Sequence, residues 1–113
     1  MNKNQNQIPI YRQGDVLLVP VSEIPESARS VSRKRSRLIL AEGEATGHHH
    51  SILVSDGVNL MEVPSQSELY LLVAEGDTLL EHQEHATIIV KKGTYRVIIQ
   101  REYDPAGERR VAD

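Results

Sequence analysis

The stretch HHHSILVSDGVNLMEV, residues 48–63, combines the two patterns on which the interpretation of this chain depends. It begins with three consecutive histidines and continues into two apolar runs separated by Ser55-Asp56-Gly57. Asp-Gly between two β-patterned runs is the strongest short-range signal for a hairpin. We therefore predict a strand over 48–54, a turn at Asp56-Gly57 and a returning strand over 58–63.

Short runs of Val, Ile and Leu between turn residues recur along the chain, as is typical of strands. Lys91-Lys92-Gly93 predicts a second hairpin, because glycine accepts a positive φ. Pro20 is expected at the end of its strand, since it cannot donate to a ladder, and Pro25 suits one helical turn. The predicted strands are 16–21, 37–41, 48–54, 58–63, 69–74, 86–90 and 94–100. About seven short strands predict an all-β, mainly antiparallel fold, either a small barrel or a sandwich.

The length of 113 residues suits one domain rather than two. We predict a flexible polar tail over 1–9, a single β domain over 10–104 and a polar C-terminal tail over 105–113. The chain has no Phe, no Trp and no Cys, so its core must be aliphatic, with four tyrosines as the only aromatic rings besides histidine. A homo-oligomer or a bound metal would support so small a core.

Composition also restricts the class of protein. The absence of Cys removes disulfides, thiolate zinc sites and cysteine nucleophiles. No run approaches the roughly 18 apolar residues of a membrane span, and the polar residues 1–7 lack the apolar segment of a secretory signal. The expectation is a cytoplasmic protein without a membrane partner.

The net charge of -3 argues against a general nucleic-acid coat, which would be basic. Basic residues nevertheless gather over Arg33–Arg37, with Arg29 just before them. Such a run is most simply a solvated face, and the alternative is a local contact with an anion or phosphate group. Nucleic-acid binding through Arg33–Arg37 stays open but is not favoured.

The five histidines are the strongest pointer to chemistry. In a strand over 48–54, His48 and His50 share a face with Ile52, because side chains alternate between the two faces. A second cluster, Glu81-His82-Gln83-Glu84-His85, precedes the strand that begins at Ala86. If the clusters meet, His48 and His50 with either His82 or His85 would supply three nitrogens. Of these we expect His48, His50 and His85 to bind one divalent transition metal ion: zinc, iron, manganese or nickel.

The remaining polar residues of these clusters are candidates for catalysis. Glu44 and Glu84 could act as a further ligand or as a general base, and His82 as an acid or base. Two alternatives stay open. The histidines could form an acid–base or anion site without a metal, or they could be inert residues of an exposed strand and loop.

The C-terminal strand offers a second candidate site. Tyr95, Arg101 and Tyr103 fall on one face of an extended segment and could line a pocket for a phosphate group or a base, since tyrosine stacks and arginine binds anions through two N–H groups. The alternative is that the tyrosines pack at the rim of an aliphatic core while Arg101 is solvated.

Three segments together resemble the cupins: Gly47-His48-His49-His50, then Glu84-His85, then Gly93-Thr94-Tyr95-Arg96-Val97. The resemblance covers roughly residues 37–100. It implies a double-stranded β-helix barrel in which His-x-His, a Glu and a later His hold one metal. The chain departs from the cupin pattern because only Asp56 follows the His-x-His pair in the same motif, and because the Pro-x-Gly before the second histidine motif is missing.

The chain also resembles small uncharacterised proteins of bacterial and phage genomes with a Thr-Gly-His-x-His segment and a Gly-Thr-Tyr-Arg-Val-x-x-Gln-Arg-Glu-Tyr end. Residues 46–50 and 93–103 carry this resemblance, which implies no function.

Three functions follow as hypotheses. The first is a metal-binding β-barrel that acts on or senses a small molecule, with hydrolysis as the reaction if it is an enzyme. The second is a metal-independent phosphodiesterase or RNA-processing protein that uses histidine acid–base catalysis on a phosphate-containing ligand. The third is a non-catalytic adaptor associated with phage or defence systems.

Overall fold

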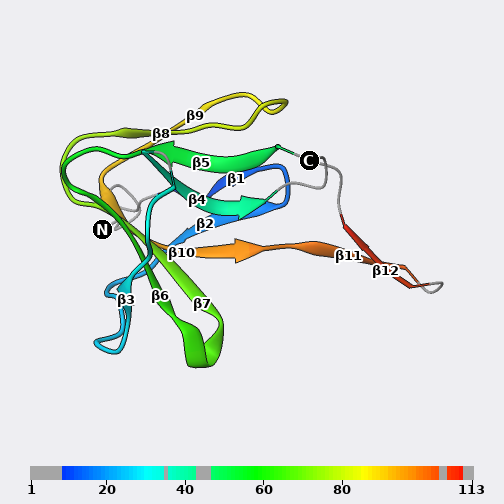
Figure 1. The fold of residues 1–113 in the computed structure, drawn as a ribbon, viewed down its shortest axis with the longest axis horizontal. Coiled ribbons are helices and arrows are strands. Elements are labelled where there is room, and N and C mark those ends of the chain that lie inside the picture. Colours follow the sequence, from blue (N-terminus) through cyan, green and yellow to red (C-terminus); the bar gives the residue numbers. More distant parts are fainter. Residues whose placement is uncertain (1–8, 35, 43–46, 105–106, 111–113) are drawn as a thin grey trace, which may run out of the picture.

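A computed structural model describes residues 9–34, 36–42, 47–104 and 107–110, with side chains described up to residue 100. It contains strands and one short 3-10 helix, and every strand pair is antiparallel (Figure 1). The elements are β1 (Tyr11–Gln13), β2 (Val16–Pro20), β3 (Arg29–Ser30), β4 (Arg37–Glu42), β5 (His49–Leu53), β6 (Val58–Val63), η2 (Pro64–Gln66), β7 (Glu68–Val73), β8 (Thr78–Leu80), β9 (Ile88–Val90), β10 (Gly93–Ile99), β11 (Arg101–Asp104) and β12 (Gly107–Arg110). The prediction of an all-β, mainly antiparallel fold is confirmed.

The first layer is a six-stranded sheet with the order β1-β2-β10-β7-β6-β3. Its centre is the pairing of β10 with β2 on one side and β7 on the other, with Val97 opposite Leu18 and Tyr95 opposite Leu71. These four side chains are at most 6% exposed, because alternate residues of each strand turn toward the same core. Pro20 ends β2, as its missing N–H predicts.

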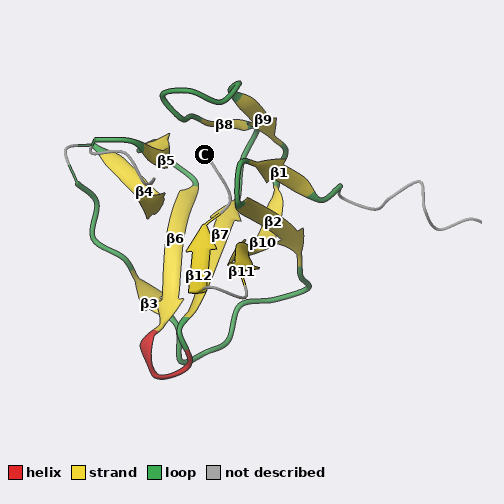
Figure 2. Ribbon diagram, turned by 90° about the vertical axis from the view of Figure 1, so that its right-hand side faces the viewer, coloured by secondary structure: helices red, strands yellow, loops and turns green. Residues whose placement is uncertain are grey.

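The second layer consists of two hairpin-like pairs, β4 with β5 and β8 with β9. An isolated bridge joins them, since Ser51 and Glu81 exchange two backbone hydrogen bonds of 2.9 Å. Leu38, Ile52 and Leu80 of this layer pack against the six-stranded sheet in one hydrophobic core. The two layers enclose that core as in an open sandwich (Figure 2), and the described strands do not form a closed barrel.

Both predicted hairpins are wrong. The strand β5 pairs with β4, while β6 pairs with β3 and β7; likewise β10 pairs with β2 and β7, while β9 pairs with β8. The first turn was placed correctly, and Gly57 has the positive φ of 83° expected there. The second was not, because Gly93 begins β10, where it pairs with Val73, and it has no positive φ. A turn reverses the direction of the chain, but it does not determine which strand the following strand pairs with. Here each strand forms its backbone hydrogen bonds with strands of its own layer.

Smaller differences concern the ends of the domain. The segment after Pro25 forms a turn, in which Ala28 N–H donates to the Pro25 carbonyl, and not a helical turn. The strand β12 lies inside the predicted C-terminal tail and pairs with β11, forming an arm that extends away from the two layers (Figure 1). Within the described residues no helix has the length and apolar character needed to cross a membrane.

Candidate histidine site

Four of the five histidine rings meet at one end of the core. The ring centroids of His50 and His82 are 4.4 Å apart, those of His82 and His85 are 4.7 Å apart, and those of His48 and His82 are 5.6 Å apart. The structure therefore brings together His48, His50, His82 and His85, as the metal hypothesis requires.

The bridge between Ser51 and Glu81 explains this convergence. In an antiparallel register, that pair places His50 opposite His82. The same register continues outward, because the backbone N–H of His49 donates to Gln83 Oε1 at 2.8 Å. The two histidine clusters are thus neighbouring strand-like segments, and alternate residues of both segments point to the same side.

The orientation of His50 is set by Gln13, a residue that the sequence analysis did not identify. The amide nitrogen of Gln13 donates to the carbonyls of Leu80 and Ala86, both at 2.9 Å. Its Oε1 must therefore face His50 Nδ1, 2.8 Å away, which donates the proton. In neutral His50 the lone pair is then on Nε2. The side-chain amide of Gln13 also links Leu80 and Ala86, which flank the segment that carries His82 and His85.

His82 has the opposite arrangement. Its Nδ1 accepts the backbone N–H groups of Glu84 at 3.0 Å and His85 at 3.3 Å. An acceptor Nδ1 leaves the proton of the neutral ring on Nε2. His82 is 8% exposed and His50 is fully buried, so two adjacent buried imidazoles hold opposite tautomers.

Asp15 supplies a carboxylate to this cluster and was also missed from the sequence. It is 3% exposed, and its Oδ1 lies 3.4 Å from His50 Nε2. Asp15 lies directly after Gly14 in the turn between β1 and β2, where the sequence indicated only a turn residue. No spacing rule connects this turn to histidines more than thirty residues away.

Gly14 packs closely against two of the rings, so that no side chain fits between its backbone and them. A Cβ at this position would lie 2.8 Å from His85 Nε2 and 3.1 Å from His50 Cε1, closer than carbon and nitrogen atoms pack. The backbone φ of 58° also favours glycine. His85 Nε2 is buried and has no hydrogen-bond partner among the described residues. Buried polar atoms without a partner are rare, so this nitrogen is a candidate ligand atom.

The other candidate residues are placed differently. Glu84 is largely exposed, with Oε2 3.8 Å from His48 Nδ1, and Glu44 lies outside the described residues. Tyr95 is fully buried, contacts the ring of Tyr11 edge-on and donates its hydroxyl proton to the Lys91 carbonyl. The structure therefore places Tyr95 in the core and not on the wall of a pocket.

Arg101 and Tyr103 belong to β11, in the part of the chain whose side chains are not described. The proposed binding role of these two residues stays a prediction.

The donor atoms of the cluster are not a preformed metal centre. In the part of the chain that the structure describes, no three His, Asp or Glu side chains are already placed to hold one ion. The donor set itself, imidazole nitrogens with one carboxylate, is nevertheless the set that borderline divalent metals prefer. Binding would require side-chain rotations that bring these donor atoms around one ion.

Fold and site together define a class: an open, two-layered antiparallel β domain with a cluster of four histidines, of which His50 and His82 are buried. The chain belongs to the family described as Domain of unknown function (DUF8820), which matches residues 12–100 and so includes all four clustered histidines. No curated protein and no solved structure matches the chain.

Proposed function

We propose that this domain binds one divalent transition metal ion through His48, His50 and His85, with Asp15 as an additional oxygen ligand. The observation that carries the proposal is the fixed orientation of His50. Its Nδ1 donates to Gln13, which directs Nε2 toward Asp15. A second hydrogen bond from the distal ring nitrogen is the usual way in which proteins orient a metal-binding histidine.

The spacing of the donor atoms supports the same proposal. Two ligands at bond lengths of about 2.0–2.1 Å from a tetrahedral ion are roughly 3.3 Å apart. His50 Nε2 and Asp15 Oδ1 are 3.4 Å apart, which is long for a charge-assisted hydrogen bond but suits two ligands of one ion. His85 Nε2 would be the next ligand, and His48, whose Nδ1 faces Glu84, the last.

His82 takes a different role in this proposal. Because its Nδ1 accepts two backbone N–H groups, its protonated Nε2 has no lone pair for a metal. It would instead donate a proton or a hydrogen bond to a molecule at the site. A bound metal with an open position would polarise such a molecule or activate water, and hydrolysis is the reaction class that this combination favours. The cupin resemblance implies a similar use of histidines.

The first test is elemental analysis by mass spectrometry of untagged protein purified without metal resin. We expect about one zinc, iron, manganese or nickel ion per chain, lost in a His50→Gln/His85→Gln variant. His49→Gln is the matched control, since His49 neighbours His50 in sequence but points to the other face of β5. Folded protein that contains no metal, and binds none when zinc is added, would refute the proposal.

A second candidate function follows from the opposite tautomers of His50 and His82. One neutral ring offers a lone pair and its neighbour a proton, which are the two requirements of general acid–base catalysis. This metal-independent phosphodiesterase would hydrolyse bis(p-nitrophenyl) phosphate in the presence of chelator, with a bell-shaped pH profile. Activity that chelator abolishes, or a flat profile, would exclude it.

A further inference from the structure

The outer face of the second layer carries a separate polar network, on the side of β5 opposite to the metal proposal. Arg37 Nη1 contacts Glu81 Oε1 at 2.8 Å and donates to Ser51 Oγ at 3.2 Å. His49 Nδ1 lies 3.0 Å from the same hydroxyl, and Gln83 Nε2 lies 3.3 Å from His49 Nε2. These residues line a hollow of about 280 Å³, to which His82 of the histidine site also contributes.

The orientation of the Gln83 amide determines which atoms of this network donate and which accept. Gln83 Oε1 accepts the backbone N–H of His49, so the amide nitrogen of Gln83 donates to His49 Nε2. Neutral His49 then carries its proton on Nδ1 and donates it to Ser51 Oγ. That oxygen already accepts from Arg37, so its own proton is left to donate. Ser51 is therefore not activated as a nucleophile here, because His49 is its donor and not its base.

The network leaves more donors than acceptors facing the hollow. The two side-chain contacts of Arg37 to described residues both use Nη1, and the guanidinium carries further N–H donors on Nε and Nη2. The hydroxyl of Ser51 and the second N–H of Gln83 add to them. Glu81 supplies the opposing acceptor through Oε2, since its Oε1 is held by Arg37. A ligand rich in acceptor oxygens matches this surplus.

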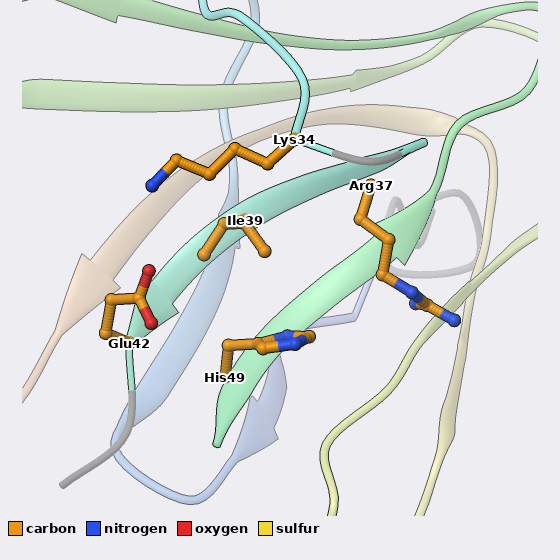
Figure 3. A pocket seen from close by; sticks show the side chains of 5 residues that line it. All are labelled: Lys34, Arg37, Ile39, Glu42 and His49. Carbon is orange, nitrogen blue, oxygen red and sulfur yellow. The ribbon is translucent and has the colours of Figure 1, made fainter. Parts of the chain in front are cut away.

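A larger hollow of about 640 Å³ adjoins the first and shares Arg37 and His49 with it. Figure 3 shows Ile39 on its floor between Arg37 on one side and Lys34 with Glu42 on the other. The apolar Ile39 would contact the carbon skeleton of a ligand, while Lys34 supplies a second cation. Glu42 and Glu81 offset the two cations, so selection here depends on directed hydrogen bonds more than on net charge.

We propose that these joined hollows bind a small organic anion, with its carboxylate or phosphate group at Arg37 and Ser51 and its carbon skeleton over Ile39. This inference goes beyond the proposed function, because the hollows lie on the face of β5 opposite to His50 and the proposed metal ligands. The binding itself can be measured whether or not a metal is present.

The test is titration of the ¹⁵N-labelled full chain, followed by NMR, with three probes: inorganic phosphate, acetate and methylammonium. We expect saturable shifts at 34, 37–42, 49–51 and 81–83 with phosphate or acetate. Whichever binds more tightly identifies the anionic group. The affinity should fall about tenfold in Arg37→Gln and stay unchanged in Lys91→Gln, an exposed cation paired with Asp77 elsewhere on the surface.

Several results would overturn the inference. These are saturation by methylammonium in place of the anions, no saturable shift with either anion, or equal weakening by Arg37→Gln and Lys91→Gln, which would indicate nonspecific charge attraction. Ser51→Ala is a second variant, because it removes a donor without disturbing the pair of Arg37 and Glu81. Metal content of Arg37→Gln, measured in parallel, separates a failure of this inference from a failure of the metal proposal.

Discussion

Replacing Gly14 with alanine tests the geometry of the histidine site. The φ of 58° costs an alanine about 1–2 kcal/mol, of which roughly 0.4–1 kcal/mol is recovered because alanine restricts the unfolded chain more than glycine does. The new Cβ would also lie 2.8 Å from His85 Nε2 and 3.1 Å from His50 Cε1. His50 is held by Gln13, so His85 must be the ring that moves.

Gly76 provides the matched control, because its φ is 64° and no atom lies within 4 Å of an added Cβ. Both Gly14→Ala and Gly76→Ala should therefore lose a similar backbone contribution. Since the end of a side chain can turn aside, the extra loss of unfolding free energy in Gly14→Ala should be only about 1 kcal/mol. The affinity for zinc should fall far more, by about 10–100-fold, because His85 Nε2 leaves its position.

Urea denaturation of the metal-free variants measures the first quantity, and competition with a chromophoric chelator measures the second. The ¹⁵N resonances of the His85 ring report its displacement even without metal. The reasoning would be refuted if Gly14→Ala kept wild-type zinc affinity and an unchanged His85 ring spectrum. It would also fail if Gly76→Ala weakened zinc binding equally.

Two further predictions concern buried polar groups. Gln13→Leu should lower the free energy of unfolding by about 2–4 kcal/mol in urea denaturation, because it leaves the carbonyls of Leu80 and Ala86 and His50 Nδ1 without their partner; a loss under about 0.5 kcal/mol would contradict this assignment. Burial raises the pKa of Tyr95 above its ordinary value of 10, so above pH 10 the unfolded chain releases a proton that the folded chain keeps, and stability falls as the pH rises. Tyr95→Phe should show a smaller loss between pH 9 and 11 by thermal denaturation, and equal losses in both proteins would count against the assignment.

The sequence identified seven of the twelve described strands, because hydrophobic patterning is local. It missed β1, β3 and β8, which are two or three residues long, and the arm formed by β11 and β12. The predicted strand 58–63 has the bounds of β6, 16–21 differs from β2 by one residue at one end, and 94–100 differs from β10 by one residue at each end. The pairing of the strands could not be predicted from the sequence in the same way. Asp56-Gly57 determined where the chain turns, but the partner of β5 depends on which edges other strands occupy.

The histidine site could be predicted from the sequence only in part, for the same reason. Alternation correctly placed His50 and Ile52 on the buried side of β5, and both are fully buried. The two clusters are joined in antiparallel register, in which His48-His49-His50-Ser51 lies opposite Glu84-Gln83-His82-Glu81. This match of two histidine-containing segments becomes apparent only once their pairing is known. Gln13 and Asp15 carried no pattern at all, because a turn residue gains its role only when the chain packs.

The stability of variants at the buried histidine nitrogens distinguishes a role in metal binding from a role in supporting the core. His85 Nε2 is buried and makes no hydrogen bond to a described residue, so exchanging the ring for a leucine removes a desolvated nitrogen and leaves no donor or acceptor of another residue without its partner. The metal-free His85→Leu protein should be as stable as wild type or more stable, by up to about 1 kcal/mol. His50→Leu should instead lose about 1–3 kcal/mol, because Gln13 Oε1 stays buried without a donor.

Urea denaturation of both variants, in chelator and then with added zinc, distinguishes the two roles. A ring kept for metal binding should show its contribution only with zinc, which stabilises wild type and neither variant. If His85→Leu is strongly destabilised in chelator, the ring supports the core directly, and the proposal that it is retained as a ligand loses its main physical argument.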